Sequence, residues 1–365
     1  MTKSIPIYVP DIGPEERENV LKCLDSTWIS SKGEFILRFE DAFAEYIGAE
    51  HATAVCNGTV ALHLALAALG IGPGDEVLVP TLTYIASANA VTYTGAKPVF
   101  CDCEPDTWQL SVEDARSKIS SRTKAIMPVH LYGGACDMTG ILALSEEHSL
   151  FVIEDCAEAI GTLHKGQHVG TFGDVATFSF FGNKTITTGE GGMLIAKSKS
   201  VFEKAVRMKG QGLAEGREYW HDVIGFNYRM TNICAAIGLA QLSKVDQYLY
   251  RKRQIAELYR NQLEGSSWIF QATNNDTDHS HWIVSLLAQE AANRDGLRSV
   301  LKQHMIETRP LFFPLHTMPM YSGQCQALPI AEGVAARGIS LPSWPGLSDL
   351  DVTRICDLVK SFHEK

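Results

Sequence analysis

Asp174-Val-Ala-Thr-Phe-Ser-Phe-Phe-Gly-Asn-Lys-Thr-Ile-Thr-Thr-Gly-Glu-Gly-Gly192 is the stretch on which the interpretation of this chain depends. The apolar, β-branched and aromatic residues from Val175 to Phe181 predict a buried strand, and the Gly-Asn pair that follows ends it. Lys184 comes directly after this pair. A lysine beside a core strand pairs with an acid, extends its amine to solvent or takes part in chemistry, and an isolated lysine is most often a surface charge. Residues elsewhere in the chain decide among these interpretations.

The composition is that of an ordinary globular protein. At 365 residues the chain suggests roughly two domains and is long enough to bury a substantial core. A hydrophobic content of 45% and a charged content of 20% are usual for soluble proteins. The formal net charge of −10 argues against general binding of nucleic acid, so we expect no nucleic-acid partner. An anionic ligand would need local dipoles and a few placed arginines.

The nine cysteines contain no Cys-x-x-Cys pair. Cys101 and Cys103 fall on a predicted strand without a second pair of ligands, and His279 and His281 lack a third ligand in register, so we expect no metal site. Reduced thiols in the cytoplasm are therefore expected rather than disulfides. The N-terminal residues have no signal-peptide core, and the longest apolar helix candidate is too short to cross a bilayer, so we expect no membrane association.

Short apolar runs alternate with helical stretches in the first half of the chain, which predicts an α/β fold with a mainly parallel sheet between helices. The predicted strands are Glu76–Pro80, Pro98–Asp102, Ala125–His130 and Phe151–Cys156, and the predicted helices are 14–25, 34–47, 84–94, 112–119 and 137–148. Ligands of such sheets gather at the carboxyl ends of the strands. In this arrangement Asp155, His130, Tyr84 and Lys184 all lie at that edge.

The pattern changes near residue 235. A long helical stretch that allows a bend is predicted over 235–259, followed by a strand at 281–289, a helix at 295–304, a short strand at 339–342 and a terminal helix at 349–363. We therefore predict two domains, a large one over 1–240 and a smaller C-terminal α+β domain over 241–365.

Asn57-Gly-Thr59 ends a short strand and begins a helix rich in alanine and leucine. The free N–H groups and the positive dipole at such a helix start favour a phosphate group. The alternative is that Thr59 only caps the helix. The motif therefore predicts a phosphate site only in combination with other residues.

Asp155 follows Phe-Val-Ile-Glu at the end of a predicted buried strand, where an unpaired carboxylate would be costly. Pyridoxal 5′-phosphate needs a lysine for covalent attachment, an acid for its ring nitrogen, a cradle for its phosphate and a flat stacking surface. Lys184, Asp155, the Gly-Thr helix start with Ser179, and Tyr84 match these four requirements. Together they predict this cofactor.

Several stretches also carry a family resemblance. They are Asn57-Gly-Thr-Val-Ala-Leu62, Pro80-Thr-Leu-Thr-Tyr84, Glu154-Asp-Cys-Ala-Glu-Ala159, Gly173-Asp-Val-Ala-Thr-Phe-Ser-Phe180, Lys184 with Gly189-Glu-Gly-Gly192, and Asn227-Tyr-Arg-Met-Thr231. Over nearly the whole chain, this set resembles the sugar-nucleotide aminotransferases of the DegT/DnrJ/EryC1/StrS family. The resemblance implies the aspartate-aminotransferase fold (fold type I), with a large cofactor-binding domain and a smaller C-terminal one.

The resemblance implies a role for each matching residue. Lys184 would attach the cofactor covalently and later move the proton, and Asp155 would pair with the pyridinium nitrogen. Glu158 occupies a cofactor-facing position where many relatives have glutamine, and a carboxylate donates no hydrogen bond unless it is protonated. Some relatives replace the lysine with histidine and are dehydratases, so the retained Lys184 favours transamination.

The remaining cofactor contacts follow from the same resemblance. Gly58, Thr59 and Ser179 would hold the phosphate, and Tyr84 would stack on the ring. Asn227 would reach the phosphate from the neighbouring subunit. The resemblance thus implies a homodimer with a shared active site.

The implied reaction transfers the amino group of L-glutamate to a 4-keto sugar nucleotide. Ser26–Gly33, Tyr219–Asp222, Glu307–Pro310 with His316–Tyr321, and Leu341–Trp344 are similar to family members that act on a GDP-linked 4-keto-6-deoxy sugar. A dTDP- or UDP-linked sugar is the alternative substrate. A regulatory protein that binds the cofactor without catalysis is the alternative of another class, and the intact Lys184, Asp155 and Ser179 argue against it.

Five residues are candidates for substrate binding: Trp28, Arg229, Arg309, His316 and Tyr321. The two guanidinium groups suit a diphosphate or the glutamate carboxylate, with an interdomain salt bridge as the alternative. Trp28 either covers a ligand or fills a crevice. His316 and Tyr321 belong to a loop rich in proline, methionine and aromatic residues, which either closes over the sugar or packs on the surface.

Overall fold

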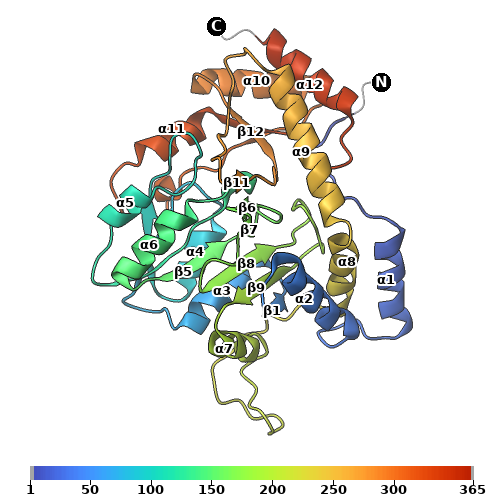
Figure 1. Cartoon of the computed structure of the whole chain (residues 1–365), viewed down its shortest axis with the longest axis vertical. Coiled ribbons are helices and arrows are strands. Elements are labelled where there is room, and N and C mark those ends of the chain that lie inside the picture. Colours follow the sequence, from blue (N-terminus) through green and yellow to red (C-terminus); the bar gives the residue numbers. More distant parts are fainter. Residues whose placement is uncertain (1–3, 363–365) are drawn as a thin grey trace.

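A seven-stranded sheet forms the centre of the molecule in this computed structural model, which describes residues 4–362 (Figure 1). In spatial order its strands are β1 (Ala52–Val55), β9 (Gly192–Ala196), β8 (Val175–Ser179), β5 (Phe151–Asp155), β4 (Thr123–Ile126), β2 (Glu76–Pro80) and β3 (Lys97–Cys101). Neighbours from β8 to β3 are parallel, whereas β9 is antiparallel to both β8 and β1. The predicted mainly parallel sheet is confirmed, and Lys184 lies in the connection between β8 and β9.

Helices cover both faces of this sheet, as predicted. One face carries α3 (Gly58–Leu69), α4 (Ala86–Tyr93) and α7 (Lys199–Lys209), and the other carries α2 (Glu34–Ile47), α5 (Val112–Ser117), α6 (Met138–His148) and α8 (Asn232–Leu242). Successive strand residues point to opposite faces. Val77 and Val79 therefore pack with α3 and α4, whereas Leu78 packs with α5 and α6. Helix α1 (Pro14–Asp25) lies outside α8, with which it makes extensive contact (Figure 1).

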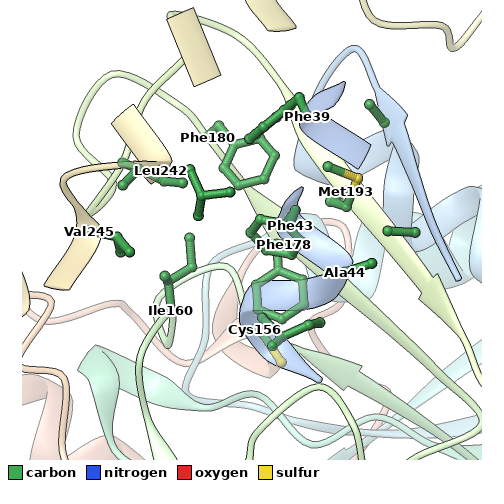
Figure 2. Close-up of a cluster of buried hydrophobic side chains, with 14 of the residues drawn as sticks. Phe39, Phe43, Ala44, Cys156, Ile160, Phe178, Phe180, Met193, Leu242 and Val245 are labelled. Carbon is green, nitrogen blue, oxygen red and sulfur yellow. The ribbon is translucent and has the colours of Figure 1, made fainter. Parts of the chain in front are cut away.

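A cluster of aromatic rings anchors the strand that leads to Lys184 (Figure 2). Phe178 of β8 lies 5.0 Å from Phe43 of α2, and Phe180 lies 5.2 Å from Phe39, measured between ring centroids. All four rings are fully buried. Aromatic side chains bury large apolar areas and pack in defined geometries. The end of β8 is therefore a rigid base for the turn that follows.

A second sheet lies in the C-terminal third of the chain. Its antiparallel strands are β10 (Ile269–Phe270), β12 (Val284–Leu287), β14 (Gly338–Leu341) and β13 (Arg309–Pro310), and around it lie α9 (Val245–Gln262), α10 (Ala291–Gln303), α11 (Pro329–Arg337) and α12 (Asp349–Ser361). Ile5 pairs with Ile306, so residues near the N-terminus also join this part. The division into domains at residue 240 stays a prediction.

Smaller elements connect these parts. They are a three-stranded sheet of β11 (Thr277–Asp278), β6 (Leu163–His164) and β7 (Gln167–His168), and the 3₁₀ helices η1 (Leu131–Gly133) and η2 (Leu315–Thr317). Neither α7 nor α11 was predicted. Across residues 4–362, no helix combines the length and the apolar character needed to cross a membrane.

The long helical stretch predicted over 235–259 forms two helices, α8 and α9, and the bend allowed in that prediction is a break at Ser243 and Lys244. The amine of Lys244 bonds the buried carboxylate of Glu16, and Ser243 Oγ bonds the carbonyl of Ala240 at 2.8 Å. These bonds favour an end of α8 at this point, and α9 then runs toward the second sheet (Figure 1). The last predicted residue of the terminal helix, His363, lies outside the described residues.

Lys252 of α9 is a fully buried lysine that joins α9 to the second sheet. Its Nζ donates to the carbonyls of Trp282, at 2.8 Å, and Ser343, at 3.3 Å. Burial lowers the pKa of this amine from 10.5 to about 7, because removal from water disfavours the charged form. The fold therefore bears the cost of a buried charge whenever Lys252 is protonated.

This cost makes stability depend on pH. Below about pH 7 Lys252 is charged in both states, whereas between pH 7 and 10.5 the folded amine is neutral and the unfolded one still binds a proton. Stability then rises with pH across this window, by up to about 1.4 kcal/mol per pH unit from this group. In urea unfolding, Lys252→Met should lose this rise, and the control Lys199→Met, at an exposed lysine of α7, should keep it. Equal slopes in wild type and Lys252→Met would contradict the assignment.

Candidate active site

Lys184 lies in the turn after β8 with its side chain 13% exposed. Its Nζ is 3.4 Å from Glu158 Oε1 and 4.1 Å from the centre of the Trp282 ring. Trp282 Nε1 donates to the carbonyl of Asn183 at 2.7 Å, and Tyr8 Oη donates to the carbonyl of Lys184 at 2.7 Å. The amine is therefore paired, and its backbone is held from two distant parts of the chain.

Asp155 ends β5 and is buried. Its Oδ2 accepts from Ser87 Oγ at 2.8 Å, and its Oδ1 accepts from the N–H of Ala157 at 3.1 Å. Burial raises the pKa of this carboxyl, while these hydrogen bonds and the charge of Lys184 oppose the rise. No ion pair holds Asp155 among residues 4–362, so a protonated ring nitrogen would supply the cation that this buried carboxylate lacks.

The start of α3 and the end of β8 meet as a phosphate cradle requires. Asn57 Oδ1 caps the helix by accepting from the N–H of Val60 at 3.0 Å. The first N–H groups of a helix, here those of Gly58 and Thr59, have no partner within the helix. A Cβ added at Gly58 would lie 2.8 Å from Ser179 Cβ, so the backbone and the buried serine are in close contact. These residues fit an anionic phosphate group.

A cavity of about 520 Å³ opens beside Asn183, the neighbour of Lys184. Its wall is largely apolar, and Tyr8, Tyr84, Tyr132, Trp282 and Phe312 are among its lining residues. The volume is within the range of small-molecule sites. Tyr84 is 58% exposed at the cavity, so its face is available for stacking.

Four of the rings that line the cavity were not predicted from the sequence as site residues: Tyr8, Tyr132, Trp282 and Phe312. The rings of Tyr132 and Trp282 lie nearly parallel, with centroids 6.3 Å apart, and Phe312 stacks on Tyr132 at 5.5 Å. Each ring comes from a different part of the chain, and none belongs to a sequence motif that indicates ligand binding. Only their meeting in the fold reveals this aromatic part of the wall.

The predicted substrate residues are not all at the cavity. Arg309 lines it, and its guanidinium is 2.9 Å from Glu307. Trp28 is exposed and does not line the cavity, and its carbonyl accepts from Asn232 Nδ2 at 2.7 Å. Asn227 and Arg229 bond each other at 3.0 Å, and Arg229 pairs with Val55 at the edge of the large sheet.

His316 and Tyr321 face the protein interior. His316 bonds Thr81 Oγ1 at 2.7 Å and Glu332 Oε1 at 3.0 Å through its two ring nitrogens. The hydroxyl of Tyr321 is 2.9 Å from Asn89 Oδ1, and its side chain is buried. Both side chains thus pack inside the chain, and their contact with substrate stays a prediction. Their neighbours Met318 and Met320 line the cavity.

His130, Glu154 and Cys156 lie close together, and the atoms of these residues that could bind a metal ion are within 4.8 Å of one another. Glu154 Oε1 accepts from the N–H groups of Phe172 and Gly173, and Oε2 accepts from Gly170 N–H and faces His130 Nε2 at 3.1 Å. Both carboxylate oxygens are thus used in holding the 170–173 loop. The backbone N–H of His130 donates to the carbonyl of Asp155 at 3.0 Å, and His130 does not line the cavity.

Comparisons with known proteins identify relatives over nearly the whole chain. A model of the DegT/DnrJ/EryC1/StrS aminotransferase family matches residues 10–360. The chain is 56% identical to GDP-perosamine synthase of Escherichia coli O157:H7, with 99% of each chain covered, and 51% identical to that of Vibrio cholerae, with 98% of this chain and 99% of the relative covered.

Two solved structures are similar over nearly the full length. The aminotransferase TlmJ from Streptoalloteichus hindustanus has a TM-score of 0.94 at 31% identity, with 98% of each chain covered. The S. venezuelae protein DesV, in complex with a ketimine intermediate, has a TM-score of 0.92 at 33% identity, with 98% of this chain and 99% of that chain covered. The fold predicted for the chain is confirmed.

The cradle predicts the effect of one added methyl group. Gly58→Ala would place a Cβ against Ser179, and such overpacking costs about 1 to 3 kcal/mol, which corresponds to a loss of roughly 5- to 150-fold in affinity for pyridoxal phosphate if the cradle must shift to bind it. Alanine favours helix more than glycine does, so α3 itself should persist. Fluorescence titration of the cofactor-free protein would measure the affinity. Gly333→Ala in α11, where the added Cβ meets open space, should bind as wild type does. Equal affinity in all three proteins would exclude Gly58 from the cradle.

Proposed function

The chain belongs to the DegT/DnrJ/EryC1/StrS aminotransferase family, and we propose that it converts GDP-4-keto-6-deoxy-D-mannose and L-glutamate into GDP-perosamine and 2-oxoglutarate. It is a transaminase that depends on pyridoxal 5′-phosphate. The choice of sugar nucleotide is supported by relatives named GDP-perosamine synthase, at 48 to 56% identity over nearly the whole chain. They do not favour a dTDP- or UDP-linked sugar or a non-catalytic protein. The product would serve the synthesis of O-antigen or another surface polysaccharide.

The proposed roles follow from the position of each residue. Bound pyridoxal phosphate supplies an aldehyde for attachment of amines and a ring that accepts electrons from a carbon losing its proton. Asp155 keeps the ring nitrogen protonated, since its buried carboxylate favours a cation beside it. Lys184 Nζ takes the proton from the amino-bearing carbon of glutamate and later returns one to C4 of the sugar. Gly58, Thr59 and Ser179 hold the phosphate.

The aromatic rings around Lys184 limit the access of water to its amine. Trp282 lies over the amine of Lys184, and Tyr132 stacks beside it, so water has little access to the proton-transferring atom. Tyr84 offers the exposed face for stacking. Arg309 is the cavity cation that suits the diphosphate or the glutamate carboxylate, after it leaves Glu307.

We also propose a homodimer in which Asn227 completes the site of the partner. Residues 211–226, here called the arm, leave the body of the molecule after α7 (Figure 1). Tyr219 and Ile224 of the arm are 93% and 87% exposed, and Trp220 is 49% exposed, which is an unusual concentration of exposed apolar side chains. A second copy of the chain would cover them. A cytoplasmic location is proposed as well, and the nine free cysteines support it.

Product analysis tests the reaction. With glutamate and GDP-, dTDP- and UDP-linked 4-keto-6-deoxy sugars offered side by side, the GDP sugar should be aminated at C4 and the others much more slowly. Lys184→Ala should lower turnover by roughly 1,000-fold or more, because the attaching amine and the proton carrier are both lost. Reaction of the dTDP sugar alone, or full turnover by Lys184→Ala, would contradict the proposal.

Hybrid dimers test the shared site. Lys184→Ala and Asn227→Ala chains, carrying different affinity tags, can be expressed together and the hybrids purified. If Asn227 acts on the partner, each hybrid contains one doubly altered site and one unaltered site, and about half of the wild-type turnover should return. If Asn227 acts within its own chain, no unaltered site exists and turnover stays low. Wild-type turnover by Asn227→Ala alone would exclude any role at the site.

A further inference from the structure

Two buried carboxyl groups share one amine in this site. Asp155 and Glu158 are 4% and 5% exposed, and the side chain of Lys184 is 13% exposed. Within residues 4–362, Glu158 is the acid in ion-pair contact with Lys184, at 3.4 Å. Two carboxylates and one ammonium leave an excess negative charge in a site removed from water, which is costly.

The two acids are held differently. Asp155 accepts from Ser87 Oγ and the N–H of Ala157, and both bonds favour its charged form. Glu158 accepts one N–H, that of Tyr132, on Oε2 at 2.9 Å, which leaves Oε1 directed at Lys184 Nζ. The ionisable groups that face Glu158 are thus Lys184, Asp155 and Tyr132. Of the two acids, Glu158 relies more on the charge of Lys184 to stabilise its carboxylate form.

Lys184 cannot remain an ammonium throughout the proposed reaction, on which this inference rests. Its nitrogen must be neutral to take a proton from carbon, and a covalently attached nitrogen is no longer a free ammonium ion. At either point Glu158 loses its cationic partner. Burial, and then the nearby charge of Asp155, raise the pKa of Glu158, and the charge of Lys184 opposes this rise. Loss of that charge favours the neutral acid.

We propose that Glu158 is a catalytic proton acceptor for Lys184: it is a carboxylate while Lys184 is a free ammonium ion, and it becomes a neutral carboxylic acid when Lys184 gives up that proton to hold the cofactor covalently. The proton moves from Lys184 Nζ to Glu158 Oε1: one N–H bond breaks, one O–H bond forms, and the ammonium–carboxylate pair becomes an amine and an acid. The reverse transfer restores the ammonium after the carbon has been reprotonated. No other reactant takes part in this transfer.

Glu158→Gln is the decisive variant. Glutamine has the shape of glutamate but one acceptor oxygen in place of two, so the change removes the proton-binding group, and the amide oxygen can keep either the N–H of Tyr132 or the contact with Lys184. Infrared difference spectra between cofactor-loaded and cofactor-free protein would detect a protonated carboxyl by a C=O stretch that shifts in heavy water. Wild type should show this band and Glu158→Gln should lack it. Asp155, if it were protonated, would give the band in both.

The glutamate half-reaction gives a second measurement. In single-turnover experiments at pH 7, Glu158→Gln should react roughly 100-fold more slowly than wild type, with partial recovery at higher pH as solvent removes the proton from Lys184. If Glu158 only positioned Lys184 through hydrogen bonds, the slower rate of Glu158→Gln would not recover as the pH rises. An absent band in wild type, an unchanged band in Glu158→Gln, or wild-type rates in the variant would overturn the inference. Failure of the wild-type protein to bind the cofactor would instead refute the proposed function.

Discussion

Two long-range hydrogen bonds fix the short turn that carries Lys184. The indole of Trp282 holds the carbonyl of Asn183, and the hydroxyl of Tyr8 holds the carbonyl of Lys184. On the other side, the turn grows from β8, whose Phe178 is locked among the rings of α2. With its backbone held at both ends, the side chain of Lys184 has little freedom. Preorganised groups of this kind avoid the cost of reordering at the moment of reaction.

Local sequence patterns were sufficient to predict those parts of the site that are formed by residues close together in the sequence. The strand before Lys184, Asp155 at the end of its strand and the helix start at Gly58 were all visible in runs of about ten residues or fewer, because strand exits and helix starts are local features. Their mutual positions also followed, since parallel strands bring their carboxyl ends to one edge.

Contacts between residues that are far apart in the sequence could not be predicted from such patterns. Nothing near Tyr8 or Trp282 indicates that their polar atoms would reach the turn of Lys184, 176 and 99 positions away for the two bonds. His316 and Tyr321 were predicted near substrate from the residue types around them, but those types did not indicate the internal hydrogen bonds that both residues form. A bend between α8 and α9 was within the prediction, but the bond from Lys244 to Glu16, more than 200 positions earlier, was not.

Electrostatics adds a constraint of its own. The net charge of −10 repels the anionic cofactor and sugar nucleotide at long range, so capture must rely on short-range groups. The helix start at Gly58 and the guanidinium of Arg309 are such groups, and salt screens the opposing field of the protein surface. The acids around Lys184 are separated from that field by the fold.

Residues 5–8 and 305–307 pair across almost the full length of the chain, and Tyr8 then reaches the turn of Lys184. During synthesis the first of these segments leaves the ribosome long before its partner exists. The large sheet can assemble meanwhile, since its strands lie within residues 52–196. In a nascent chain the turn of Lys184 would thus lack the contacts made by Trp282 and by the 5–8 segment. The last hundred residues would complete these contacts at the end of translation.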